Sequence, residues 1–480
     1  MSARRKAIIL VSCCLSLLIV SMDATIVNVA IPSIRSDLGA SASQMQWVID
    51  IYTLVLASLL LLSGATADRI GRRRTFHIGL AVFAVGSLLC SLAPSIEMLI
   101  AARFLQAVGG SMLNPVAMSI ITQVFTGRVE RARAIGVWGG VVGISMALGP
   151  IVGGVLIEYV DWRAVFWINL PICALAILLT AVYVPESRSV GMRDVDPVGQ
   201  ALGMAFLFGL VTVLIEGPGL GWGSPVVIAI AVAAVLALAA FLRYEARRRD
   251  PFIDLRFFRS IPFASATVIA VCAFAAWGAF LFMMSLYLQG ERGFSAVHTG
   301  LIYLPVAVGA LIFSPLSGRL VGRFGARPSL LVAGTLITAA TLMLTGLSAT
   351  TPVWWLLIVF AVFGIGFSMV NAPITNAAVS GMPTDRAGAA SAIASTSRQV
   401  GVSLGVALCG SVAGAALAGE GVDFAVAARP LWLVFTGFGL LVFALGVLST
   451  SRRGLRSAER LAPLVAAGDA ARDSGRVRAA

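Results

Sequence analysis

Long apolar segments alternate with short polar segments along most of the 480-residue chain. A transmembrane helix needs about 20 mostly apolar residues. This length predicts fourteen such helices, over 7–31, 46–66, 75–93, 98–124, 134–157, 163–184, 197–216, 225–243, 262–289, 297–318, 328–347, 353–379, 390–416 and 430–450. We therefore predict an all-α polytopic membrane protein.

The composition excludes a water-soluble globule. Hydrophobic residues make up 59% of the chain and charged residues 12%, whereas soluble domains carry roughly 45–50% and about 25%. The two helices at 197–216 and 225–243 are the least certain, and without them the chain would cross twelve times. The apolar, uncharged stretch 225–242 favours fourteen crossings.

The distribution of positive charge predicts the topology. Of the 35 Lys and Arg residues, 29 fall in segments on the side of the N-terminus and four in the opposite loops. Cytoplasmic loops are enriched in Lys and Arg, so both termini are expected in the cytoplasm. The arginines occur in short clusters between long uncharged stretches, a pattern that fits membrane topology better than a nucleic-acid-binding groove. No nucleic-acid partner is therefore expected, despite the formal charge of +13.

Few residues could support enzymatic chemistry. Lys6 is the single lysine, so a phosphate-binding loop that needs Gly-Lys-Ser/Thr cannot form. His77 and His298 are far apart and give no metal-ligand spacing. We expect neither an enzyme nor a cofactor or metal site.

An internal duplication organises the chain. The run Ser63-Gly64 to Gly71 is echoed by Ser317-Gly318 to Gly325 at an offset of 254, and Ser111–Asn114 by Ser368–Asn371 at an offset of 257. Transporters built from repeats bind substrate between the two halves, near the bilayer midplane. The predicted domains are a cytoplasmic N-terminus (1–6), a six-helix bundle (7–184), a linker with two inserted helices (185–261), a second six-helix bundle (262–450) and a cytoplasmic tail (451–480).

Ionisable residues inside predicted helices are candidate functional groups, because they are costly in a bilayer. Asp23, Asp50 and Arg103 share the outer half of the first bundle, with Asp23 roughly 12 Å deep at about 1.5 Å per residue. A carboxyl near an arginine can load and release a proton; the alternative is a static ion pair that fixes the packing of the helices. Arg398 could bind an anionic or polar substrate group or pair with a carboxylate, and Glu216 is expected at the interface.

Two further patterns concern packing and turns. The fifth helix carries small residues at helical spacing and one proline, a pattern that allows close helix approach and a bend: Gly136, Gly139, Gly140, Gly143, Ser145, Gly149, Pro150, Gly153 and Gly154. The loop after the second helix combines glycines, which relax the backbone, with an acid and arginines: Gly64, Asp68, Arg69, Gly71, Arg72, Arg73 and Arg74.

Four of these motifs resemble those of the major facilitator superfamily, in its fourteen-helix drug:proton antiporter branch. They are Met22–Pro32 in the first helix, the Gly64–Arg73 loop, Leu99-x-x-x-Arg103-x-x-Gln106 in the fourth helix, and Gly136 through Gly154 in the fifth. Thr66, Ala107 and Ser145 depart from the usual residues. The resemblance extends from about residue 7 to residue 450.

This resemblance implies a major facilitator fold, with two six-helix bundles and two inserted helices, that exports lipophilic, possibly cationic, compounds across the bacterial inner membrane. A proton gradient would drive the transport, with Asp23 as the proton site, Arg103 as its modulator and Asp68 with Arg72 as a gate. We expect a monomer. The alternatives are a dedicated exporter of one antibiotic or secondary metabolite and, more remotely, a membrane sensor without a transport cycle.

Overall fold

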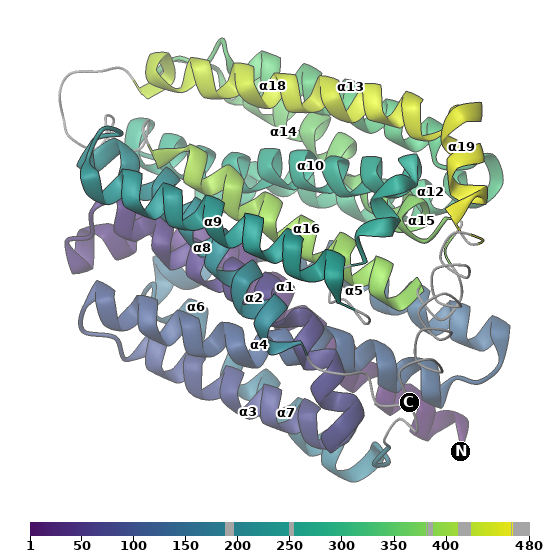
Figure 1. The fold of residues 1–480 in the computed structure, drawn as a ribbon. Helices are drawn as coiled ribbons and strands as arrows, with labels where there is room; N and C mark the ends of the chain where they lie inside the picture. The colour runs from purple at the N-terminus through teal and green to yellow at the C-terminus, as the bar shows by residue number, and fades with distance from the viewer. Residues whose placement is uncertain are drawn as a thin grey trace.

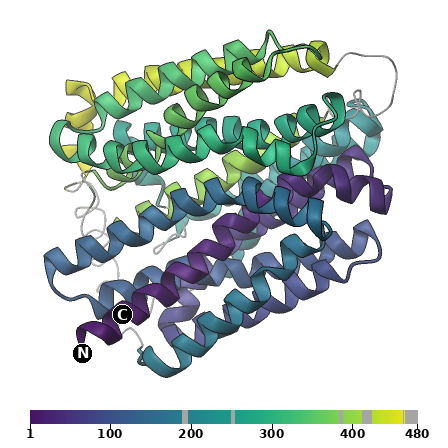
Figure 2. The ribbon, with the colours of Figure 1, turned by 180° about the vertical axis from the view of Figure 1, so that it is seen from behind.

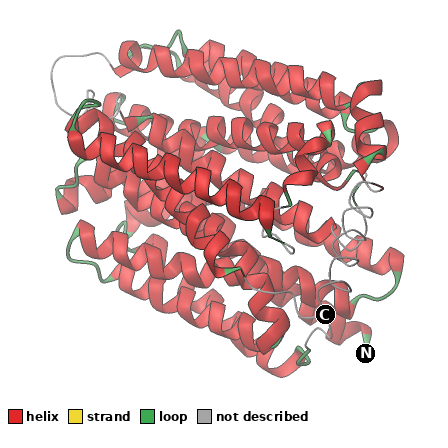
Figure 3. Cartoon of the chain, in the orientation of Figure 1, coloured by secondary structure: helices red, strands yellow, loops and turns green. Residues whose placement is uncertain are grey.

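The computed structural model describes residues 1–187, 196–248, 254–380, 382, 387–410, 424–461 and 463. Over these ranges the chain is helical and contains no strand (Figure 3). The first helices are α1 (Ala3–Leu38), α2 (Ala42–Ile70), α3 (Arg72–Ser91), α4 (Ile96–Val124), α5 (Arg128–Tyr159), α6 (Ala164–Trp167), α7 (Asn169–Tyr183), α8 (Pro197–Leu220) and α9 (Pro225–Arg247).

The rest of the chain repeats this organisation. Its helices are η1 (Leu255–Arg259), α10 (Ile261–Leu286), η2 (Tyr287–Glu291), α11 (Ala296–Ile302), α12 (Leu304–Phe324), α13 (Arg327–Leu344), α14 (Val353–Ser368), α15 (Asn371–Val379), α16 (Ala387–Leu408), α18 (Phe424–Ser449) and α19 (Arg452–Glu459). Helices overlap all fourteen predicted segments. Eleven helical spans of the described chain are long and apolar enough to cross a membrane, or up to twelve with α2, which bends by 51°. The all-helical membrane fold is confirmed, and the number fourteen stays a prediction.

Side-chain caps set several helix boundaries. Ser41 and Gln44 form a capping box at the start of α2, in which each side chain accepts a hydrogen bond from the other residue's backbone N–H. Gly39 ends α1 in the left-handed conformation, with a φ of 64°. The helix therefore continues through Pro32 to Leu38, beyond the predicted end at residue 31.

The helices form two groups with α8 and α9 beside them. Helices α1–α7 pack mainly on one another, as do α10–α18, and α8 contacts α9, α2 and α16 (Figures 1 and 2). The two groups meet where α2 contacts α16, α5 contacts α11 and α12, and α1 contacts α10. This arrangement agrees with two bundles and an inserted pair, although the exact domain limits stay predictions.

The outward side of α9 is apolar, as expected for a helix that faces lipid. Exposed residues on it are Val226, Ile228, Val232, Val235, Leu236 and Leu242. A hydrophobic surface of this kind would be unfavourable in water but is stable in the hydrocarbon region of a bilayer. The apolar outer side of α9 therefore supports the conclusion that the chain is a multi-pass membrane protein.

The duplicated serines make corresponding contacts in the two groups. The Ser63 and Ser111 hydroxyl groups lie 3.0 Å apart between α2 and α4. In the second group, the Ser317 hydroxyl of α12 donates to the Met369 carbonyl, directly after α14, over 3.0 Å. The repeat pairs Ser63 with Ser317 and Ser111 with Ser368, and Met369 is the residue directly after Ser368. The two contacts therefore lie at corresponding places in the two groups, which supports the predicted duplication.

Glycines allow α5 to approach both groups closely. A Cβ atom at Gly149 would lie 2.0 Å from the Thr25 hydroxyl of α1, and one at Gly153 would lie 2.7 Å from Ile26. On the next face of α5, a Cβ atom at Gly154 would overlap the Ala296 carbonyl of α11. The small residues of α5 therefore pack against both halves, as small residues do at tight helix interfaces.

Two polar contacts join the halves on the face opposite to Ala3 and α19, which we call the distal face. The Glu158 carboxylate, just beyond the predicted span of α5, accepts a hydrogen bond from the Val297 backbone N–H at the start of α11 over 2.9 Å. The Gln289 amide donates to the Val29 carbonyl of α1 over 3.0 Å. These contacts hold the distal ends of the two halves together.

We predict that Gly149→Val destabilises the protein, because the larger side chain would push α5 away from α1. Overpacking of a tight interface costs about 1–3 kcal/mol. The control is Gly322→Val in α12, where an added Cβ meets no atom within 4 Å. Thermal unfolding of the purified protein should show a lower Tm for the first variant only, and equal Tm values would refute this account of the interface.

We further predict that acid loosens the distal contact. Hydrogen bonds from Ser295 and from the Val297 backbone, together with nearby His298, lower the pKa of Glu158 from its ordinary value of 4.5. The stabilisation that ionised Glu158 gives to the contact is therefore present above pH 4.5, the ordinary pKa. It is lost as the pH falls through the lowered pKa of the folded protein. At neutral pH, Glu158→Ala should speed hydrogen exchange of the α11 N-terminal amides, and this difference should vanish in acid.

The matched control for this experiment is Glu97→Ala. Glu97 is also exposed, but it bonds to Gln44 within one half. Unchanged exchange in Glu158→Ala, or an equal effect of Glu97→Ala on α11, would show that Glu158 does not join the halves.

Candidate functional site

Asp23 lies near the middle of α1 and is completely buried. Helix α1 continues to Leu38, beyond the predicted end of its span at residue 31, and the depth of Asp23 in the bilayer stays a prediction. The fifteen residues from Asp23 to Leu38 span about 22 Å at about 1.5 Å per residue. The carboxyl is thus placed deep in the helical bundle, where a charge is stable only when it is paired.

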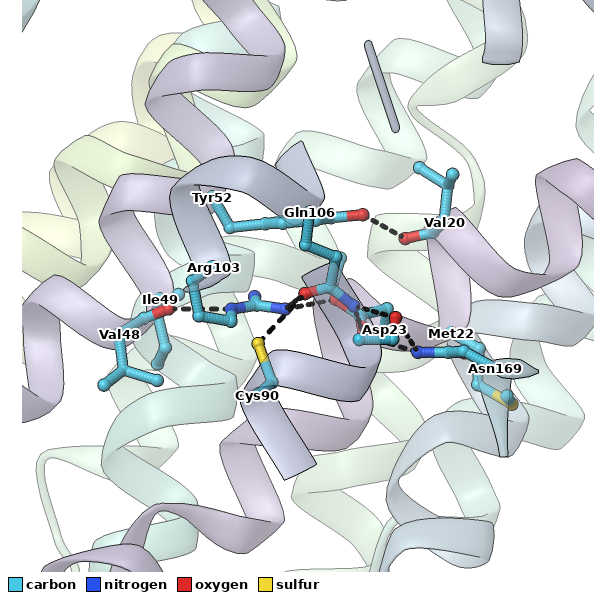
Figure 4. A network of polar contacts seen from close by, with 12 residues as sticks. Val20, Met22, Asp23, Val48, Ile49, Tyr52, Cys90, Arg103, Gln106 and Asn169 are labelled. Carbon is cyan, nitrogen blue, oxygen red and sulfur yellow. Dashed lines mark hydrogen bonds and ion pairs between the residues drawn. The ribbon is translucent and has the colours of Figure 1, made fainter. Parts of the chain in front are cut away.

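Arg103 of α4 provides that pairing. Its guanidinium forms an ion pair with Asp23, and both side chains are at most 1% exposed (Figure 4). The same guanidinium donates to the Gln106 amide oxygen over 2.7 Å and to the Val48 carbonyl over 3.1 Å. The Tyr52 ring lies 4.1 Å from the guanidinium carbon, a favourable distance for a cation–π contact.

Two amides complete the coordination of Asp23. Gln106 donates to one carboxylate oxygen over 2.8 Å, and Asn169, the first residue of α7, donates to the same oxygen over 3.0 Å. Both amides also donate to the Ser87 hydroxyl of α3. Asn169, Ser87 and Tyr52 were missed as site residues from the sequence. Asn169 is a polar residue within an apolar run, which was the available signal.

Asp50 occupies a different environment. It is completely buried in α2, on the side that contacts α16, and Ser403 of α16 and Thr53 face its carboxyl. Within the described part of the chain, neither oxygen of the Asp50 carboxylate accepts a hydrogen bond. In this conformation α16 covers Asp50, so the residue lies inside the contact between the two halves.

Arg398 lies far from the Asp23 pair in the chain, in α16, and is half-buried. Its guanidinium donates to the Asn371 side-chain oxygen over 3.1 Å and to the Ser395 hydroxyl over 3.2 Å. Among the described residues it forms no ion pair, so the predicted alternative of pairing with a carboxylate is not observed. The structure brings Asp23 and Arg103 together but leaves Asp50 and Arg398 outside this network.

The predicted gating loop is mostly helical. Because α2 extends to Ile70, Gly64, Asp68 and Arg69 belong to the helix, and Gly71 alone forms the turn, with a φ of 112°. Arg72 lies 3.3 Å from the Asp68 carboxylate. Such a short connection requires a residue that tolerates positive φ, which explains the glycine.

Glu186, which the sequence analysis did not single out, holds this turn. Its carboxylate accepts a hydrogen bond from the Arg73 backbone N–H over 3.2 Å and lies 3.8 Å from the Arg74 side chain. A Cβ atom at Gly71 would overlap this carboxylate. Glu186 therefore links the turn to the end of α7.

The remaining predicted residues lie as follows. Gly136, Gly149, Pro150, Gly153 and Gly154 all belong to α5. Glu216 accepts a hydrogen bond from the Trp47 indole over 2.9 Å. No group of three or more His, Cys, Asp or Glu residues with metal-binding geometry occurs in the described ranges. The functional roles assigned to all these residues stay predictions.

Comparisons with known proteins agree with this architecture. The chain is 36% identical over 409 residues to the multidrug resistance protein Stp of Mycobacterium tuberculosis, covering 85% of this chain and 76% of that protein. It is also 36% identical to the tetracenomycin C resistance and export protein of Streptomyces glaucescens, covering 84% and 74%. The multidrug efflux pump LfrA of Mycolicibacterium smegmatis is 34% identical, covering 83% and 79%.

A solved structure shares the fold. A bacterial homologue of the human lysosomal transporter Spinster, in an inward-facing and unoccupied conformation, superposes with a TM-score of 0.60 at 17% identity, covering 98% of this chain and 99% of that one. The family model for the Major Facilitator Superfamily matches residues 13–406. The chain therefore belongs to the Major Facilitator Superfamily of membrane transporters.

Proposed function

We propose that the protein is a proton-coupled efflux antiporter that exports lipophilic compounds from the cytoplasm, with both termini cytoplasmic, in the bacterial inner membrane. The observation that carries this proposal is the buried Asp23–Arg103 pair. Relatives named for multidrug resistance and antibiotic export support the direction of transport. The gradient itself supplies the energy, so no cofactor is needed, and the protein acts as a monomer.

Protonation of Asp23 offers a physical basis for coupling. A proton on the carboxyl removes the negative charge that balances Arg103 and leaves a buried guanidinium without a counter-ion, which is costly. This cost is relieved in one of two ways. Either the surrounding helices move so that water reaches Arg103, or Asp23 releases the proton again. Binding a proton and changing conformation thus become linked events.

Asp50 fits a second role in the same cycle. A buried ionised carboxylate that accepts no hydrogen bond is costly, so we propose that the contact between α2 and α16 favours a proton on Asp50. Separation of α2 from α16 would expose the carboxyl to water and favour release. We propose that Asp50 senses whether the two halves are apposed, while Asp23 acts within the first half.

The second candidate function is a dedicated exporter of one antibiotic or secondary metabolite. It is favoured by relatives named for single compounds, such as the tetracenomycin C exporter and the puromycin resistance protein of Streptomyces alboniger. Susceptibility tests with a broad panel of unrelated compounds, in cells expressing the protein, separate the two. Protection against several unrelated scaffolds supports a multidrug pump, and protection against one supports a dedicated exporter.

We predict that Asp23→Asn abolishes substrate-induced proton movement in proteoliposomes, because an amide cannot release a proton at this site. The measurement is the collapse of an imposed pH gradient, followed with a pH-sensitive dye, after substrate is added. Asp37→Asn is the matched control, because Asp37 lies on the same helix but contacts Trp162 and Arg163 at the distal face. Full proton exchange by Asp23→Asn would remove this residue from the mechanism.

We also predict that Arg103→Ala changes the pH profile of transport, because the compensating charge beside Asp23 is lost. The pH profile of Arg103→Lys should fall between those of Arg103→Ala and the unsubstituted protein. Lysine keeps the positive charge but not the hydrogen bonds to Val48 and Gln106. Transport rates measured across a pH series, with Arg163→Ala as the control, test this. A profile identical to that of the unsubstituted protein would show that Arg103 does not modulate the proton site.

A further inference from the structure

A surface groove lies between α14 and the consecutive helices α11 and α12 of the second half. It has a volume of about 570 Å³ and is lined by apolar side chains, among them Leu301, Val308 and Leu357, with His298 at one end. Small-molecule sites occupy about 300–1,000 Å³. The groove is therefore large enough to hold a ligand, and its lining suits a hydrocarbon chain.

The groove opens on the surface that faces the bilayer. Leu304 and Leu357 on its two walls are both exposed. Its floor is closed where the backbones of α12 and α14 touch: a Cβ atom at Gly364 would lie 2.6 Å from the Val306 Cα, and one at Gly309 would lie 3.1 Å from the Gly364 carbonyl carbon. An occupant therefore enters from the lipid side.

The groove starts at the distal face and is about as long as one leaflet is thick. His298 directly follows Val297 of the distal contact, and the α14 wall runs from Val353 to Ile365, about 18 Å at about 1.5 Å per residue. Half of a hydrocarbon core of about 30 Å is about 15 Å. Trp354, beside Val353, is largely exposed, as tryptophans at the membrane–water boundary are. The distal end of the groove therefore lies at the level of the lipid headgroups.

An arginine stands at this distal end. The Arg292 guanidinium donates to the Thr351 carbonyl, two residues before Val353 of the α14 wall. Its central carbon lies 5.0 Å from the centre of the Phe294 ring, and the Phe294 ring stacks on the His298 ring at 5.1 Å. Arg292 therefore adjoins both walls of the groove, through Thr351 on one side and Phe294 on the other.

The charge of Arg292 is available to an anion. In the described ranges it forms no ion pair, and its Nη1 atom donates to two neutral oxygens, the Tyr287 hydroxyl over 3.2 Å and the Thr351 carbonyl. A guanidinium has five N–H donors, and its fork geometry suits a phosphate group. His298 shares its surroundings with Glu158, so we assign the charge contact to Arg292 alone.

We propose that this groove binds an anionic phospholipid of the distal leaflet. One acyl chain lies along Leu301, Val308 and Leu357, and the phosphate accepts hydrogen bonds from Arg292. The lipid-facing side of α9 lacks this combination, because residues 217–224 before it carry no charge. The inference goes beyond the proposed efflux function and depends neither on the direction of transport nor on its coupling to protons.

Photo-crosslinking of the purified full-length protein in phosphatidylcholine nanodiscs tests this proposal. The probes are phosphatidylglycerol and phosphatidylcholine with identical acyl chains that carry a diazirine group, and peptide mass spectrometry locates the adducts. We expect phosphatidylglycerol to label 301–313 and 353–365 about fivefold more than phosphatidylcholine does, the preference that one arginine near a headgroup provides. The outer side of α9 is the internal control, and both lipids should label it equally.

The variants separate the charge from the groove. Arg292→Gln should lower labelling by phosphatidylglycerol to the level of phosphatidylcholine, and Arg292→Lys should restore part of the preference. The charge control is Arg429→Gln, which removes an exposed arginine of α18 and should keep the full preference. Val308→Trp should fill the groove and remove most labelling of 353–365 by both lipids. Its matched control is Leu311→Trp, at an exposed position of α12 outside the groove lining.

Four results would overturn the proposal. The first three are equal labelling of the groove by the two lipids, an unchanged preference in Arg292→Gln, and an equal loss of preference in Arg429→Gln. The fourth is labelling of α9 without any adduct in the groove, which would indicate another occupant, such as a second copy of the chain. If Arg292→Gln fails to fold, the comparison of the two lipids in the unsubstituted protein and the Val308→Trp variant still decide the question.

Discussion

The ion pair between Asp23 and Arg103 is the interaction on which the first half depends. It is a charge pair within an apolar bundle, and a buried pair persists only when its remaining donors and acceptors are satisfied. The protein meets this requirement with groups from several helices: Val48 from α2, Ser87 from α3, Gln106 from α4 and Asn169 from α7. One electrostatic constraint thereby fixes the mutual positions of five helices, counting α1.

Close backbone contact supplies the complementary constraint between the halves. At Gly149, Gly153 and Gly154, α5 has no room for a β-carbon against α1 or α11, so dispersion contacts extend along the helix. Such an interface has few hydrogen bonds to break. Its polar contacts in the described chain include those of Glu158 and Gln289 at the distal face and, between α2 and α16, those of Gln46 with the Val406 carbonyl and of Thr396 with the Ala57 carbonyl. The interface therefore combines good packing with a small number of directional bonds.

The sequence predicted the helical membrane fold, the family and the proximity of Asp23 and Arg103, because hydropathy and motif spacing report these features directly. It could not reveal Asn169 or Glu186 as partners, since those contacts join helices that are distant in the chain. The burial of Asp50 also escaped prediction, because it depends on α16 rather than on its own helix. The ends of α1 and α2 were placed too early, because apolarity alone does not mark where a capped helix stops.

The corresponding serine contacts of Ser63 and Ser317 have an evolutionary consequence. Both halves kept the hydroxyl that joins their second and fourth helices, yet only the first half carries intramembrane acids in the described spans. After duplication, one copy was free to change its polar chemistry while the shared scaffold stayed intact. The polar chemistry of the two halves can therefore differ while each half keeps the serine contact between its second and fourth helices.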